Sequence, residues 1–191
     1  MTFNFAKDAW SMDGLTYAYS YRFEETSIFI QEHDCIRNSK DETAPQGFDN
    51  ISLLTQHPCK PGTTITTRCS FDHFGAPLIM IAEQLHTDER GFLRYGNYLE
   101  IVLYKKGVNV WRMWLRDGKV SWKKLMSVEF PVAEKEIHTL STKVTDERLE
   151  IEACGRKMTL FIPDMYPVFH AGINACEDIN RFYSLHIDMG E

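Results

Sequence analysis

The sequence lacks the features that would place the protein in or across a membrane. None of its apolar runs approaches the roughly 20 residues that a bilayer-spanning helix needs. Its first residues, MTFNFAKDAW, contain neither the basic start nor the apolar stretch of a secretory signal. We therefore expect no membrane partner and a cytoplasmic location.

Basic clusters and paired cysteines are missing as well. Lysine and arginine never occur more than two in a row, and the formal net charge is −6, whereas nucleic-acid-binding surfaces are basic. We expect no nucleic-acid partner. The 5 cysteines are widely spaced without a CxxC pair, a pattern typical of free thiols in a reducing compartment. No zinc, calcium-loop, Walker A or dinucleotide motif is present, so the sequence predicts no cofactor.

Helical periodicity is scarce, and short segments rich in β-branched and aromatic residues alternate with turn residues instead. The expected strands are Leu15–Phe23, Ser27–Cys35, Asn50–Leu54, Thr63–Phe71, Leu78–Leu85, Tyr98–Tyr104, Val108–Leu115, Val120–Met126, Glu136–Thr142, Arg148–Ala153, Lys157–Ile162, His170–Ala175 and Arg181–Asp188. Two polar stretches, Arg37–Asp49 and His86–Gly96, are predicted to be long loops. The pattern predicts an all-β fold, a two-sheet antiparallel jelly-roll sandwich, as one domain over residues 1–191.

The most informative segment is a predicted meander of three strands. Its first turn, Lys105-Lys106-Gly107, fits a three-residue hairpin loop with glycine at the left-handed position. This loop would place Glu100 opposite Arg112 and Tyr98 opposite Trp114. The register matters, because it decides which side chains share a face of the sheet.

The second turn of the meander, Asp117-Gly118, suits a two-residue type I′ turn. That turn would place Trp114 opposite Ser121 and Arg112 opposite Lys123. One face of the meander would then be apolar and belong to the core: Leu99, Ile101, Leu103, Trp111, Met113, Leu115, Val120 and Trp122. The other face would mix charge with aromatic rings: Tyr98, Glu100, Tyr104, Arg112, Trp114, Ser121 and Lys123.

The charged and aromatic face is predicted to bind a ligand, and a saccharide suits it. Tyr98 and Trp114 would stack on a sugar ring, while Glu100, Arg112 and Lys123 would hydrogen-bond its hydroxyls. The alternative is a solvated face on which Glu100 and Arg112 form a cross-strand pair worth about 0.2–1 kcal/mol.

Three residues are candidates for acid–base catalysis. Glu83 lies in an otherwise apolar stretch, where burial would raise the pKa of its carboxyl group. Together with Glu100 it could form the carboxylate pair that glycosidases use, with His86 as another acid or base. The alternative is that Glu83 is only an ion-pair partner of Arg112 or Arg94.

The segment FHAGINACE near the C-terminus offers further polar groups. His170 and Asn174 would share one face of a strand and could extend the ligand-binding surface. Equally, they could be buried polar groups with hydrogen bonds to their neighbours. Gly172, in the middle of this strand, indicates a bulge or a close approach of another backbone segment.

Several segments taken in order resemble one known superfamily: Gly75–Glu83, Tyr95–Tyr104, Val110–Trp114, Leu149–Asp164 and His170–Ile187. They resemble the concanavalin A-like lectin/glucanase jelly rolls, in particular small stand-alone bacterial members associated with sugar and plant-polysaccharide use. The resemblance covers about residues 10–190 and lies in the order of strands.

The resemblance implies a carbohydrate-binding or carbohydrate-processing protein that holds a saccharide on its concave sheet. It also implies that structural calcium could be bound, through Asp188 or other carboxylates. The E-x-D-x-x-E strand of laminarinase-type members is absent, since Tyr98–Tyr104 contains one acid, so retaining-glucanase chemistry is not expected. A glycoside hydrolase or lyase that uses Glu83 with Glu100, or His86, is the alternative to binding alone.

Overall fold

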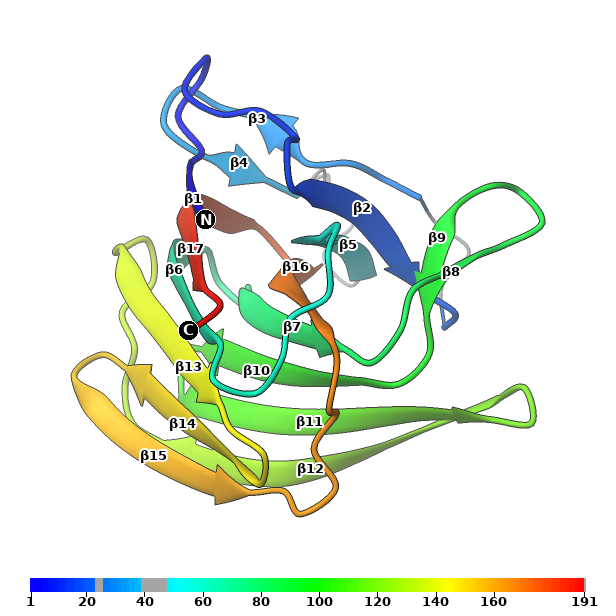
Figure 1. Cartoon of the computed structure of the whole chain (residues 1–191). Helices are drawn as coiled ribbons and strands as arrows, with labels where there is room; N and C mark the ends of the chain where they lie inside the picture. Colours follow the sequence, from blue (N-terminus) through cyan, green and yellow to red (C-terminus); the bar gives the residue numbers. More distant parts are fainter. Residues whose placement is uncertain (23–25, 39–47, 191) are drawn as a thin grey trace.

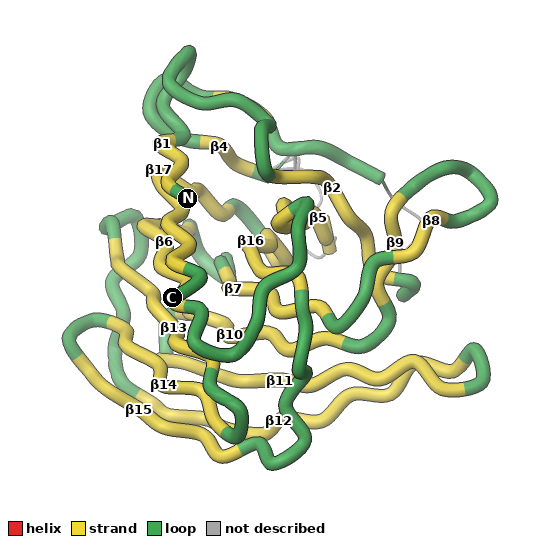
Figure 2. The backbone as a smooth tube through the Cα atoms, in the orientation of Figure 1, coloured by secondary structure: helices red, strands yellow, loops and turns green. Residues whose placement is uncertain are grey.

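The computed structural model describes residues 1–22, 26–38 and 48–190. These residues form strands, turns and loops without a helix (Figure 2). The strands are β1 (Thr2–Asn4), β2 (Leu15–Ser20), β3 (Ile30–Gln31), β4 (Ile36–Arg37), β5 (Phe48–Thr55), β6 (Thr64–Phe71), β7 (Leu78–Ala82), β8 (His86–Thr87), β9 (Leu93–Tyr95), β10 (Tyr98–Tyr104), β11 (Gly107–Arg116), β12 (Lys119–Glu129), β13 (His138–Val144), β14 (Arg148–Ala153), β15 (Arg156–Phe161), β16 (His170–Glu177) and β17 (Asn180–Asp188).

The strands form two sheets that pack face to face (Figure 1). The nine-stranded sheet has the order β12-β11-β10-β7-β16-β5-β2-β9-β8. The eight-stranded sheet has the order β15-β14-β13-β6-β17-β4-β3, with β1 also paired to β17. Strands distant in sequence, such as β7 and β16 or β6 and β17, are therefore neighbours, as in a jelly roll.

Alternation along the central strands produces two apolar layers. In β7, Ile79 and Ile81 point into the core between the sheets, whereas Met80 and Ala82 belong to a second cluster on the opposite face. Strand β10 repeats this division. The second cluster comprises Ala18, Leu54, Ala76, Leu78, Met80, Ala82, Tyr95, Tyr98, Val102 and Met113. The outer face of the nine-stranded sheet is thus partly covered, which leaves a limited area open for a ligand.

The predicted all-β sandwich is confirmed, but some predicted elements differ. The expected strand Ser27–Cys35 is wrong, because it is reduced to the two residues of β3 before the chain bends into β4. The expected loop His86–Gly96 contains the short strands β8 and β9, which pair with each other. Of the expected loop Arg37–Asp49, residues 39–47 lie outside the described part of the chain. Among the described residues, no helix could cross a membrane.

Candidate functional site

The register of the first hairpin differs from the prediction by one residue. Tyr104 pairs with Gly107, so the loop has two residues, and Glu100 pairs with Trp111 instead of Arg112. Gly107 has a φ of 129°, and a Cβ atom there would lie 2.0 Å from a backbone carbonyl oxygen of β12. The glycine is therefore the first residue of β11 rather than the last residue of a loop.

The one-residue shift turns β11 over relative to β10. Trp111 and Met113 share the outer face of the sheet with Glu100, and the prediction that they belong to the core is wrong. Arg112 and Trp114 lie on the opposite face instead. The predicted ligand-binding surface is therefore divided between two sides of the sheet.

The second hairpin agrees with the prediction. Arg112 pairs with Lys123 and Trp114 with Ser121 across the Asp117-Gly118 turn. Both turn residues have positive φ, 51° and 70°, as a type I′ turn requires. The hairpin extends beyond the other strands of its sheet (Figure 1).

A cavity of about 330 Å³ lies on the outer face of the nine-stranded sheet; we call it the outer cavity. Its walls come from β10, β11, β12, the end of β16, Arg22 and the loop before β7. The lining residues are Arg22, Phe74, Gly75, Ala76, Leu78, Glu100, Val102, Tyr104, Lys105, Asn109, Trp111, Met113, Trp122, Cys176 and Glu177. Its volume is at the lower end of the range for small-molecule sites.

Glu100 lies in the wall of this cavity, and its pKa is shifted. Burial raises the pKa of its carboxyl group to about 7, while the positive charge of Arg22 opposes the rise and the negative charge of Glu177 adds to it. At neutral pH a large fraction of Glu100 is therefore protonated. A protonated carboxyl can donate one hydrogen bond and accept others, so it suits a ligand with hydroxyl groups.

Asn109 and two indole rings complete the polar and aromatic wall. The side-chain oxygen of Asn109 is buried and has no hydrogen-bond donor among the residues that the structure describes. Trp122 is 53% exposed, and the guanidinium of Arg22 lies 4.8 Å from its ring centre. The ammonium of Lys124 lies 4.9 Å from the ring centre of Trp111. The cavity thus combines a hydrogen-bond acceptor, the oxygen of Asn109, with two indole rings that each contact an exposed cationic side chain.

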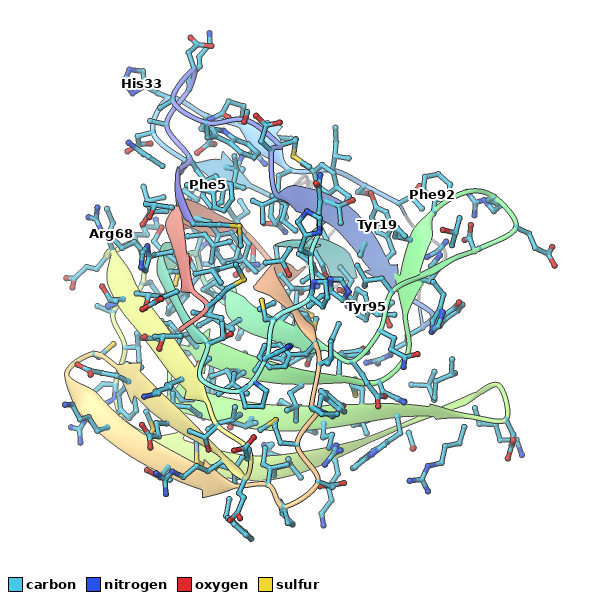
Figure 3. All side chains as sticks on the ribbon, viewed as in Figure 1. Phe5, Tyr19, His33, Arg68, Phe92 and Tyr95 are labelled. Carbon is cyan, nitrogen blue, oxygen red and sulfur yellow. The ribbon has the colours of Figure 1, made fainter. Side chains whose placement is uncertain are left out.

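Tyr98 is on the predicted face, but it is not available to stack on a ligand. Its side chain is buried, its hydroxyl lies 3.2 Å from the Ser20 hydroxyl, and its ring packs edge-to-face against Tyr95 (labelled in Figure 3) at 4.9 Å. The predicted stacking role for Tyr98 is therefore wrong, since both tyrosines belong to the apolar cluster under the outer face.

His170 and Asn174 also lie outside the outer cavity. The amide of Asn174 is buried and donates hydrogen bonds to Asn50 and to the Ser52 hydroxyl, the latter at 2.7 Å. The Nδ1 atom of His170 forms a hydrogen bond of 2.7 Å with the carbonyl oxygen of Thr55. Of the two alternatives for these residues, the structure favours buried polar groups that join β16 to β5.

Arg112 and Trp114 form a cluster on the opposite face of the sheet. Arg112 donates to a carboxylate oxygen of Asp164 at 2.6 Å, and its guanidinium lies 5.4 Å from the ring centre of Trp114. Lys123, opposite Arg112 in β12, is exposed to solvent. These predicted ligand-binding residues therefore do not meet Glu100 in one site.

The predicted catalytic acids are separated as well. Glu83 follows β7 and accepts a hydrogen bond of 2.7 Å from the amide of Asn97. Together with His86 it lines a smaller cavity of about 160 Å³ that does not include Glu100. The structure does not bring Glu83 and Glu100 together, whereas Glu177, which the sequence analysis did not consider, shares the cavity with Glu100.

Asn109 and Glu177 were not predicted to belong to a site, and the prediction that Trp111 and Trp122 belong to the core is wrong, since both line the outer cavity. In β11 both alternating faces are rich in apolar residues, so hydrophobicity does not distinguish them. Asn109 was the one available signal, because a polar side chain between two core valines marks the outward face, and Trp111 is two residues further along.

The structural calcium implied by the resemblance has no preformed cluster of carboxylate ligands among the described residues. Calcium takes six to eight oxygen ligands. Within residues 1–22, 26–38 and 48–190, no three His, Cys, Asp or Glu side chains come together as metal ligands. Asp188 is exposed and accepts a hydrogen bond from the backbone of Gly190.

No family model and no curated protein sequence matches the chain. Solved structures do match. Carbohydrate-binding module CBM66 from Bacillus subtilis aligns with a TM-score of 0.64 and 13% identity, covering 92% of this chain and 95% of the module. The exoplasmic/lumenal domain of VIP36, in a Ca2+/Man3GlcNAc-bound form, aligns with 0.62 and 10%, covering 98% and 88%.

An enzyme is also among these structures. An endo-β-galactosidase from Clostridium perfringens that releases GlcNAcα1-4Gal aligns with a TM-score of 0.64 and 7% identity, covering 98% of this chain and 60% of the enzyme. The chain therefore has the concanavalin A-like lectin/glucanase jelly-roll fold, as the resemblance predicted. At these identities the match establishes the fold, and the function must be argued from the site.

Proposed function

We propose that the protein binds a saccharide in the outer cavity. The observation that carries the proposal is that one cavity combines the carboxyl group of Glu100, the indoles of Trp111 and Trp122, and the amide oxygen of Asn109, which has no donor among the described residues. Sugars have hydroxyl groups for the polar atoms and C–H faces for the rings. The names of the structural neighbours, a carbohydrate-binding module, a glycan-bound lumenal domain and a galactosidase, support the same ligand class.

Each polar group has a distinct part in this binding. An unpaired buried acceptor costs about 1–3 kcal/mol, so a sugar hydroxyl that donates to Asn109 removes an existing penalty. Glu100, about half protonated at pH 7, donates in its protonated form to a second hydroxyl. A sugar ring stacks on Trp122 by using its free face or by displacing Arg22, whose exposed cation–π contact is worth about 0.5–1 kcal/mol.

Trp122→Ala is expected to weaken saccharide binding at least about tenfold, since loss of one stacking surface worth about 1.4 kcal/mol has that effect. Titration calorimetry with the best ligand from a glycan array measures the change. Phe161→Ala is the matched control, because Phe161 is 62% exposed on β15 of the other sheet and should leave affinity unchanged. Unchanged affinity in Trp122→Ala, or an array on which the wild type binds nothing, would contradict the proposal.

We propose glycoside hydrolysis as a second candidate function, on one specific observation. Glu100 and Glu177 line the same cavity, and the charge of Glu177 contributes to the raised pKa of Glu100. Glycosidases pair a protonated acid, which protonates the leaving oxygen, with an ionised carboxylate on the other side of the bond. Glu100 would act as the acid, and Glu177 as the base or nucleophile.

Each of the variants Glu100→Gln and Glu177→Gln is expected to reduce hydrolysis at least about 100-fold, the usual range for loss of an acid or base. Release of reducing ends from a panel of oligosaccharides measures the rate, because a sugar leaving group needs the proton that the acid supplies. Glu129→Gln, an exposed residue at the end of β12, is the control. If the wild type binds a glycan but cleaves none of these oligosaccharides, the binding function stands and the hydrolytic one is excluded for that panel.

A further inference from the structure

A second cavity lies on the opposite face of the same strands, at the open end of the sandwich; we call it the end cavity. It has a volume of about 280 Å³, and its lining includes Glu83, Arg112, Trp114, Arg116, Asp164 and Tyr166. The segment between β15 and β16 crosses β10–β12 here (Figure 1) and supplies the last two of these residues. Because Glu100 and Arg112 lie on opposite faces of the sheet, the end cavity is distinct from the outer cavity.

The end cavity contains two buried N–H and O–H groups that have no hydrogen-bond acceptor among the residues that the structure describes. The side chain of Arg112 is 8% exposed, and its Nε–H has no hydrogen-bond acceptor among the described residues. Tyr166 is 4% exposed, its ring centre lies 5.3 Å from the Arg112 guanidinium, which also interacts with its hydroxyl, and the O–H has no acceptor among the described residues. Such groups lost their hydrogen bonds to water on folding and gained none in the protein. A ligand with hydroxyl groups can supply these hydrogen bonds.

The charges around the end cavity are balanced. Arg112 and Arg116 contribute two positive charges, and Glu83 and Asp164 two negative ones. Asp164 already accepts from Arg112 at 2.6 Å and from no other described side chain, and its side chain is 71% exposed, which leaves its second oxygen available. The two acids would repel an anion, and the two guanidinium groups would repel a cation. The balance favours an uncharged ligand with several hydroxyls.

We propose that the end cavity is a second binding site, specific for a neutral saccharide. Trp114 provides the flat apolar surface for the ring. Arg112 and Tyr166 donate to ring or hydroxyl oxygens, and the free oxygens of Asp164 and Glu83 accept from hydroxyls. Glu83 is held in place by Asn97, whose own oxygen accepts from the backbone of Leu115 in β11 at 2.9 Å.

The test uses the four tryptophans as reporters. In the full-length 15N-labelled protein the indole N–H signals of Trp10, Trp111, Trp114 and Trp122 are assigned with single Trp→Phe variants. Glucose, galactose, mannose and fructose are titrated to about 100 mM, which reveals millimolar binding, with glucuronate as the acidic counterpart of glucose. At least one neutral sugar is expected to shift the Trp114 signal saturably and more tightly than glucuronate.

Variants separate the two sites. Asp164→Asn, a nearly isosteric change at an exposed side chain, is expected to weaken the Trp114 response at least about threefold, and Trp114→Ala should abolish saturable shifts in the amide signals of Asp164, Met165 and Tyr166. Trp122→Ala should leave the Trp114 response unchanged. The proposal is overturned if no neutral sugar shifts the Trp114 signal, if glucuronate binds there more tightly than every neutral sugar tested, or if Trp122→Ala removes the response. Signals of Trp111 and Trp122 report the outer cavity independently.

Discussion

Replacement of Glu100 by glutamine is expected to stabilise the protein at about pH 8.5 by up to about 3 kcal/mol and to change its stability little near pH 4. Burial raises the pKa of this carboxyl group from 4.5 to about 7 in the folded protein. The folded state must therefore ionise a group in a poorly hydrated position whenever the pH exceeds that value. Glutamine keeps a similar shape and never ionises.

The direction of the effect follows from proton binding in the two states. Below about pH 4.5 Glu100 is protonated in both the folded and the unfolded chain, so it contributes no penalty. Between pH 4.5 and 7 the unfolded chain loses the proton while the folded one retains it, and the free energy of unfolding falls as the pH rises. Above about pH 7 the penalty is complete and constant.

Urea unfolding of the wild type and Glu100→Gln at about pH 4, 6 and 8.5 measures this difference. The stability gap should open across the middle of this range. Glu129→Gln is again the control, because an exposed carboxylate is expected to shift the unfolding free energy by no more than about 0.5 kcal/mol at any of these values. A gap of the same size at all three pH values would show that Glu100 ionises normally and would remove its role as a hydrogen-bond donor.

Gly172→Ala is expected to lower the free energy of unfolding by about 3 kcal/mol or more. A Cβ atom at Gly172 would lie 1.9 Å from the carbonyl oxygen of Leu53 and 2.9 Å from its carbonyl carbon. Both are backbone atoms of β5, which pairs with β16 at the centre of the nine-stranded sheet. A backbone cannot move aside as a flexible side chain can, so the two strands would have to separate.

Gly118→Ala provides the comparison for Gly172→Ala. Nothing lies within 4 Å of a Cβ atom at Gly118, so alanine there causes no clash. The residue has a φ of 70°, and holding alanine in this left-handed conformation lowers the free energy of unfolding by about 1 kcal/mol. Thermal and urea unfolding should therefore rank Gly172→Ala well below Gly118→Ala in stability. Equal losses would contradict the close approach of β5 and β16.

Local sequence chemistry predicted several features correctly. The Asp117-Gly118 dipeptide predicted the β11–β12 turn and its pairing, because two residues with positive φ are needed there and glycine and aspartate tolerate them. Gly172 predicted a bulge or a close backbone approach, and the structure shows the close approach, with Leu53 as the neighbour. These features depend on a few consecutive residues or on one residue without a side chain.

The candidate site was predicted less well, for a reason that lies in one hairpin. Lys105-Lys106-Gly107 fits both a three-residue loop and a two-residue loop followed by Gly107 in the strand. Because β11 is largely apolar on both faces, Asn109 is the one residue of the strand that distinguishes the two registers. Because of the one-residue difference, Trp111 and Met113 lie on the same face as Glu100, where Arg112 and Trp114 were predicted. The predicted surface is therefore divided between two cavities.

The amino-acid sequence by itself determined that this protein is an all-β sandwich, since strand formation depends on local alternation, β-branched residues and turn residues. Only the tertiary structure decided which side chains meet. Glu100 shares a cavity with Glu177 because β10 and β16 both flank β7, although the two acids are far apart in sequence. Similarly, Arg112 meets Asp164 because the chain between β15 and β16 crosses the open end of the sandwich. Pairings of this kind depend on the packing of the whole chain, which no short segment of sequence encodes.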